Sequence, residues 1–135
     1  MYKLASLLAS SFFLFTLWVI YIANTGGSSI FFRISNSIPY GDKLGHFILF
    51  GCFTLLLNFA FKFKKTIFYS SNIMLGTLCV IVFALGEEIT QAFIPRREFD
   101  FIDLGSDALG IALFNYLSLR ASEGFRFYKF AIKRR

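Results

Sequence analysis

The segment GEEITQAFIPRREFDFID, residues 86–103, is a polar interruption between two long apolar runs. It places adjacent glutamates, adjacent arginines and two aspartates in a chain of 135 residues that is 56% hydrophobic and only 16% charged. A soluble domain of this length needs more polar surface than that to cover its core, so the apolar excess must face lipid. The sequence therefore predicts an integral membrane protein that turns back at this segment.

Four apolar runs are long enough to cross a membrane as helices, because a hydrocarbon core of about 30 Å takes roughly 20 helical residues. The runs are 4–23, 44–61, 67–85 and 104–119. They predict one domain, 1–135, with an all-α fold: a four-helix transmembrane bundle in the cell membrane. A secretory signal is the alternative for the first run, but its apolar part exceeds the usual length of roughly 7–15 residues. The segment 24–41 is expected to be an external loop.

Lysine and arginine are unequally distributed between the two sides of this bundle. Ten lie in segments that share a side with both termini, and four lie on the other side: Arg33, Lys43, Arg96 and Arg97. Because cytoplasmic segments carry the Lys/Arg excess, both termini are expected inside and residues 86–103 at the outer face. The basic, aromatic cytoplasmic tail 120–135 is expected to contact anionic membrane lipids, with no nucleic acid as a partner.

Polar side chains gather at the outer ends of three predicted helices. Spacings of three and four residues place three pairs on shared helix faces: Asp42 with His46, Glu88 with Gln91, and Asp103 with Asp107. Glu87 is as compatible with this layer as with lipid headgroups. Asp107 lies one turn into the membrane and needs a partner or a wet cavity, so it is a functional candidate. Gly110 continues the same face and permits close helix packing.

The connection between the last two predicted helices carries Arg96 and Arg97, which we expect to lie over the carboxylates. A guanidinium group binds carboxylate, phosphate and other oxyanions through paired donors.

Several spaced motifs resemble the VanZ-like family of small integral membrane proteins, which is named for a role in low-level teicoplanin resistance. The motifs are DKLGHFILFG (42–51), Glu88-x-x-Gln91, Arg97 six residues before Asp103, and Asp103-x-x-x-Asp107-x-x-Gly110. The resemblance is strongest over 40–115. It implies a set of signature polar residues: Asp42, Lys43, His46, Glu88, Gln91, Arg97, Asp103 and Asp107. The sequence departs from the family at Asp107, where many members have asparagine.

The favoured hypothesis is recognition, at the outer face, of an anionic or lipid-linked cell-wall molecule or a glycopeptide of the teicoplanin type. Arg97, with Arg96 and Lys43, would contact the anion, and His46 would be the pH-sensitive member. The remaining members would orient the arginine or bind sugar hydroxyls: Glu88, Gln91, Asp103 and Asp107. Asp42 joins them as a ligand-binding residue through the family resemblance.

Two alternatives stay open. One is a membrane-embedded hydrolase or transferase acting on a lipid-linked phosphate, with acid–base groups or divalent-cation ligands from His46, Glu88, Asp103 and Asp107. The other is a structural or interaction subunit whose ionic layer only locks the helices. The sequence contains neither HExxH nor G-x-S-x-G, so binding is expected rather than catalysis, with no metal or other cofactor required. It leaves the oligomeric state open.

Overall fold

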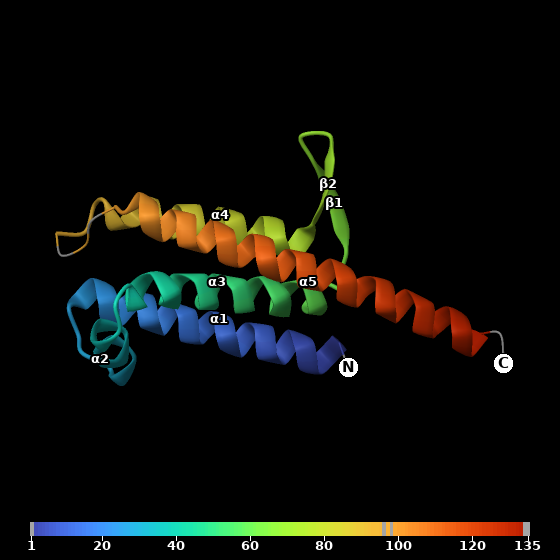
Figure 1. The fold of residues 1–135 in the computed structure, drawn as a ribbon, viewed down its shortest axis with the longest axis horizontal. Coiled ribbons are helices and arrows are strands. Elements are labelled where there is room, and N and C mark those ends of the chain that lie inside the picture. The colour runs from blue at the N-terminus through green and yellow to red at the C-terminus, as the bar shows by residue number, and fades with distance from the viewer. Residues whose placement is uncertain (1, 96, 98, 134–135) are drawn as a thin grey trace.

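The computed structural model describes residues 2–95, 97 and 99–133, except for the side chains of residues 2, 36 and 125–133. Its elements are α1 (Tyr2–Thr25), α2 (Ile30–Ser37), α3 (Gly41–Ala60), β1 (Lys65–Phe68), β2 (Ser71–Met74), α4 (Leu75–Gln91) and α5 (Phe101–Lys133). Four long helices lie side by side, and α5 extends beyond the others (Figure 1). The predicted helical fold is confirmed, since each of the four apolar runs contains most or part of a long helix.

The third apolar run begins as a β-hairpin, so the prediction of a helix from residue 67 is wrong up to the start of α4. Strands β1 and β2 pair antiparallel, with Lys65 opposite Met74 and Phe68 opposite Ser71. Between them, Tyr69 and Ser70 both adopt the left-handed backbone region. Two such residues in succession make the tight turn that matches the twist of a hairpin. The hairpin projects sideways from the bundle (Figure 1).

The segment 24–41 contains a short helix and is not the plain loop that the sequence predicts. The Ser29 side chain accepts a hydrogen bond from the backbone N–H of Phe32 and caps the start of α2, as serine commonly does at helix N-termini. The helix ends just before Pro39, because a proline disfavours helical backbone in the residue that precedes it. Helix α2 crosses the end of the bundle beside the start of α3 (Figure 1).

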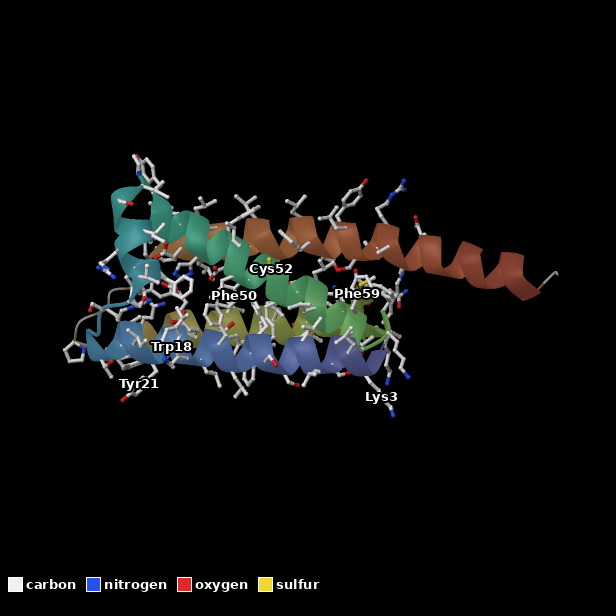
Figure 2. The ribbon with its side chains drawn as sticks, turned by 90° about the horizontal axis from the view of Figure 1, so that it is seen from below. Lys3, Trp18, Tyr21, Phe50, Cys52 and Phe59 are labelled. Carbon is white, nitrogen blue, oxygen red and sulfur yellow. The ribbon has the colours of Figure 1, made fainter. Side chains whose placement is uncertain are left out.

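The core is formed by aromatic and aliphatic side chains of three helices: Phe50, Phe53, Val80, Ala84 and Ile111. Phe50 points inward between the helices (Figure 2). Phe12 and Phe13 of α1 pack against this cluster from one side.

Helices α3 and α5 approach each other closely at two glycines. A Cβ atom at Gly110 would overlap the backbone carbonyl of Phe47, and one at Gly51 would lie 2.5 Å from the Phe114 ring. The predicted close packing at Gly110 is thus present in the structure, and it brings the first turns of α5 against the first turns of α3.

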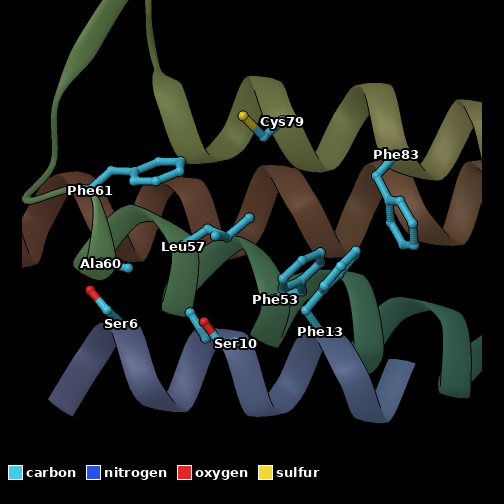
Figure 3. Close-up of a pocket in the computed structure, with 10 residues that line it drawn as sticks. Ser6, Ser10, Phe13, Phe53, Leu57, Ala60, Phe61, Cys79 and Phe83 are labelled. Carbon is cyan, nitrogen blue, oxygen red and sulfur yellow. The ribbon is translucent and has the colours of Figure 1, made fainter. Parts of the chain in front are cut away.

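A second polar cluster ties three helices together at the opposite end of the bundle. The Asn58 side chain donates to the Thr77 hydroxyl at 2.9 Å and accepts from the Thr77 backbone N–H at 3.0 Å, while the Thr77 hydroxyl donates to Asn115 at 2.7 Å. A cavity of about 400 Å³ lies near this end between α1, α3 and α4 (Figure 3). It is lined by apolar and hydroxyl-bearing side chains and by Cys79, without a carboxylate or histidine.

Much of the outer surface of the long helices is apolar, with Leu7, Val82 and Leu109 each more than 60% exposed. Within the described residues, two helices are long and apolar enough to cross a membrane, judged by length and composition: Lys3–Thr25 and Gly41–Ala60. These features, which suit a lipid environment, support the prediction of a membrane protein. Four spans and a cytoplasmic location of the termini stay predictions.

Candidate functional site

Ten polar side chains form one layer where α3 and α5 begin and α4 ends. We call this group the polar layer: Asp42, Lys43, His46, Glu87, Glu88, Gln91, Arg97, Asp100, Asp103 and Asp107. The chain reverses direction between successive long helices, so three distant segments of sequence meet at one end (Figure 1). The structure therefore brings together the residues that the sequence singles out, apart from Arg96, which lies outside the described residues.

Lys43 is surrounded by carboxylates. Its Nζ atom lies 2.5 Å from Asp100, 2.7 Å from Asp103 and 3.0 Å from Asp42. The hydrogen bond from Lys43 holds the pKa of Asp100 below its ordinary value. The sequence assigns Lys43 to an external anion, but in the structure its charge is already matched by three acids of the protein.

Asp100 is a member of the layer that the sequence analysis did not select. Besides binding Lys43, its carboxylate accepts a hydrogen bond from the backbone N–H of Ile102 at 2.8 Å, in the first turn of α5. An aspartate immediately before a helix is a frequent N-cap residue. That position was the sequence signal that could have identified it.

His46 connects α3 to α5. Its Nδ1 atom lies 3.0 Å from Oδ1 of Asp107, and its Nε2 atom lies 3.9 Å from Oδ2 of Asp103. The ring stacks on Phe50 with a centroid separation of 6.0 Å. Asp107 therefore has the partner that its depth in the bundle requires, but only for one of its two oxygens.

The α4 part of the layer is organised by Gln91. Its Nε2 atom donates to Glu87 at 2.7 Å and to Glu88 at 3.1 Å, and its Oε1 atom accepts from Nε of Arg97 at 3.1 Å. Glu87 is buried and lies 3.9 Å from the Arg97 guanidinium, so it belongs to the layer. The described side-chain contacts of Arg97 are to Gln91 and Glu87 of α4.

The described part of the layer carries six carboxylates but only two permanent cations, Lys43 and Arg97, so it has a formal excess of four negative charges with His46 neutral. This contrasts with the chain as a whole, whose formal net charge is +6. Buried acids without matching cations are costly. The excess can be relieved by protonation of the buried acids, which are Glu87, Glu88, Asp103 and Asp107, or by a further cation.

An amphipathic cavity of about 930 Å³ opens beside the layer. Its walls include apolar side chains of α1 and α2, among them Phe15, Ile20 and Phe31. At its polar end it is lined by Asp42, Lys43, His46, Glu87, Gln91, Arg97, Asp100 and Asp103. Glu88 and Asp107 do not line the cavity but lie behind these residues.

Three members of the layer have the donor atoms and proximity to hold a metal ion. One ligand atom from each of His46, Glu88 and Asp107 lies within 4.8 Å of the other two. One imidazole nitrogen and two carboxylate oxygens suit a divalent transition metal.

Comparison with known proteins agrees with the resemblance of the motifs. The chain is 30% identical over 76 residues to an uncharacterized protein of Schizosaccharomyces pombe, an alignment that covers 56% of this chain and 45% of the relative. The chain thus spans less than half the length of that relative. No solved structure matches it. The model of the VanZ/LLP1 family matches residues 4–121, which is most of the chain. This protein therefore belongs to the VanZ/LLP1 family.

Proposed function

We propose that this protein crosses the cell membrane four times and recognises an amphipathic, lipid-linked molecule of the cell envelope through an anionic headgroup at the outer face. The observation that carries the proposal is the cavity of about 930 Å³ whose apolar walls end at the polar layer. Its size suits a ligand site, since such sites usually measure about 300–1,000 Å³. Hydrocarbon would lie against α1 and α2, and the headgroup would meet the layer.

Arg97 is the residue best suited to an anionic headgroup. It lines the cavity, and Gln91 orients it by accepting from Nε at 3.1 Å. That hydrogen bond uses only Nε, so it does not occupy the two terminal nitrogens of the guanidinium. One of these, Nη2, lies 3.9 Å from Glu87. A guanidinium held in this way presents a planar pair of donors to phosphate or carboxylate. Lys43 has a supporting role, because its ammonium is shared by three acids.

The four-span arrangement is supported by the order of the four long helices, which alternate in direction along the chain (Figure 1). Helix α4 has 17 residues, or about 26 Å at 1.5 Å per residue, which is slightly short for a hydrocarbon core of about 30 Å. Its acidic end would reach the interface, where charges cost less. The start of α1 and the C-terminal part of α5 point to the same end of the bundle (Figure 1). The Lys/Arg excess at that end supports a cytoplasmic location for it.

Cysteine labelling in intact cells tests this orientation. In a background with Cys52→Ala and Cys79→Ala, we expect Phe93→Cys to react with a membrane-impermeant thiol reagent and Tyr69→Cys to react only after lysis. Phe93 and Tyr69 are 82% and 93% exposed and lie at opposite ends of the bundle, so they form a matched pair. Labelling of Tyr69→Cys alone in intact cells would reverse the orientation, and labelling of both would contradict a single topology.

Photo-crosslinking to the purified protein in nanodiscs tests recognition. The probes are a photoreactive polyprenyl phosphate and the neutral polyprenol of equal length. We expect the phosphate to crosslink to residues of α1 and α2, with competition by unlabelled polyprenyl phosphate. Arg97→Lys should weaken that competition about tenfold at unchanged thermal stability, because lysine keeps the charge but loses the paired donors. Displacement by teicoplanin instead would identify a glycopeptide as the ligand.

Two alanines of α1 provide the control for the cavity. Ala23 lines it, whereas Ala5 lies near the other end of the same helix. Ala23→Trp should abolish specific crosslinking by filling the cavity, and Ala5→Trp should preserve it. Equal labelling by phosphate and polyprenol, unaffected by Ala23→Trp, would contradict the proposal. A parallel loss of stability and crosslinking in Arg97→Lys would favour a purely structural layer, and release of inorganic phosphate would favour the hydrolase.

A further inference from the structure

One oxygen atom in the polar layer stands out among the described side chains. Oδ2 of Asp107 is buried and has no hydrogen-bond partner, although Oδ1 of the same carboxylate is paired with His46 at 3.0 Å. Oδ1 of Asp103 also accepts no hydrogen bond, but it forms an ion pair with the Lys43 ammonium at 2.7 Å. Asp107 is therefore the acid whose buried charge is least compensated, and burying such an oxygen without a partner is unfavourable.

The side chains around this oxygen are of the types that commonly bind metal ions. Asp107 and Glu88 have side chains that are almost completely buried, and their oxygens lie with a His46 ring nitrogen in a set no wider than 4.8 Å. The 3.0 Å between Nδ1 of His46 and Oδ1 of Asp107 is a hydrogen-bond distance. Neighbouring ligands of a tetrahedral Zn²⁺ ion with bonds of about 2.1 Å lie about 3.4 Å apart, so an ion would replace this hydrogen bond after a small movement of the two side chains. The three residues come from α3, α4 and α5, so an ion there would join three helices.

The residues around Glu88 already hold it in a fixed orientation. Its Oε1 accepts from the backbone N–H of Asp100 at 2.8 Å, and its Oε2 accepts from Gln91 at 3.1 Å. Each carboxylate oxygen has a second lone pair, so both hydrogen bonds are compatible with metal ligation. Outer partners of this kind orient ligands and raise metal affinity.

The surroundings also favour a cation and allow it to enter. The described layer has a formal excess of four negative charges. His46 and Asp103 line the cavity, while Glu88 and Asp107 lie just behind them. Because His46 lines the cavity, an ion held by the three ligands would lie next to the cavity.

We propose that His46, Glu88 and Asp107 bind one divalent transition-metal ion of the Zn²⁺ or Mn²⁺ class at the polar end of the cavity. The mixture of one imidazole and two carboxylates matches this class better than Mg²⁺ or Ca²⁺, which prefer oxygen ligands alone. The ion also explains how a layer rich in acids can attract an anionic headgroup, a part of the inference that rests on the proposed function: the metal supplies positive charge to the headgroup alongside Arg97.

Metal binding can be measured directly on the wild-type chain, because His46 is its only histidine. The protein is purified through a tag that lacks histidine, stripped with EDTA and titrated with Mn²⁺ and with Zn²⁺. We expect one ion per chain. Pulsed electron paramagnetic resonance on bound Mn²⁺ should detect a coordinated imidazole nitrogen, with the signal changing when histidine is labelled with ¹⁵N. Failure of both ions to bind stoichiometrically, or bound Mn²⁺ without a nitrogen ligand, would overturn the proposal.

Variants locate the site independently of the spectroscopy. Asp107→Asn, Glu88→Gln and His46→Gln should each weaken binding by at least about tenfold, the lower end of what even an outer-shell change costs. Glu123→Gln is the control: Glu123 lies on α5 outside the layer, pairs with Arg120 at 3.6 Å and is 58% exposed, so the variant should retain wild-type affinity. Equal affinity in the three cluster variants and the control would refute the assignment.

The crosslinking assay separates this inference from the proposed function. If polyprenyl phosphate labels the protein equally with Mn²⁺ and with EDTA, the headgroup needs no metal, and the proposed recognition stands without this part of the inference. If the metal binds with a nitrogen ligand but neither lipid probe is retained, the metal site stands and the proposed function fails.

Discussion

Replacing Gly110 with leucine is expected to prevent stable packing of α5 against α3. A Cβ atom at this position would overlap the backbone carbonyl oxygen of Phe47, and a backbone atom cannot rotate out of the way as a side chain can. Overpacking of this kind typically costs about 1–3 kcal/mol and sometimes more. We expect a value at or above the upper end, measured as the free energy of unfolding in mixed micelles. Any relaxation that separates the helices would also move Asp107 away from His46.

Gly105 provides the matched control on the same helix. Apart from the adjacent backbone of α5 itself, no heavy atom lies within 4 Å of the position that its Cβ would occupy, and leucine there would face the surroundings of the bundle. Gly105→Leu should therefore unfold at nearly the same denaturant concentration as the wild type. Equal stability of the two leucine variants would show that the α3–α5 contact is looser than the structure indicates.

Replacing Lys43 with methionine is the second change for which we expect a large effect. Methionine keeps much of the length of the side chain but removes the cation shared by Asp42, Asp100 and Asp103. Loss of one partner from a fully buried ion pair costs about 3–5 kcal/mol. Asp42 and Asp100 are 57% and 34% exposed, so solvent reduces their share. We expect a loss of about 2 kcal/mol in the free energy of unfolding at neutral pH.

A second substitution tests the cause of that loss. Asp103 is the least exposed of the three acids around Lys43. Asp103→Asn should therefore restore part of the stability when combined with Lys43→Met, although it is destabilising alone. Such non-additivity in a double-mutant cycle reports direct coupling. Arg33→Met on α2 removes an exposed cation from the same end of the bundle (Figure 1) and should change the free energy of unfolding very little. Additive effects for Lys43 and Asp103 would argue against their ion pair.

The long helices were the most predictable part of the fold. The runs 4–23 and 44–61 correspond to α1 (Tyr2–Thr25) and α3 (Gly41–Ala60) within a few residues at each end. Uninterrupted apolar sequence of this length has few alternatives to a helix in lipid, where every backbone polar group needs an internal partner. The hairpin and α2 were missed because both are short, and their conformation depends on turn and capping residues rather than on hydrophobicity.

The convergence of the polar residues also followed from the sequence. Successive helices that run antiparallel place the start of α3, the end of α4 and the start of α5 at one level, and spacings of three and four residues select the faces. Which residues pair with one another within the layer could not be predicted from the sequence. Lys43, which the sequence assigned to a ligand, contacts three acids of the protein, and Arg97, which was expected over the carboxylates, lies 3.9 Å from Glu87 and donates a hydrogen bond to Gln91.

The sequence by itself determined that this chain is a helical, lipid-compatible protein of the VanZ/LLP1 family with an acidic and basic layer at one end, because hydrophobic length, helical periodicity and motif spacing are local properties. Only the tertiary structure decided which charges meet, that Asp107 keeps one buried oxygen without a partner, and that an amphipathic cavity ends at the layer. These features depend on the rotation and separation of α3, α4 and α5. Both are set by contacts between distant residues, such as the backbone approach at Gly110, that no local pattern records.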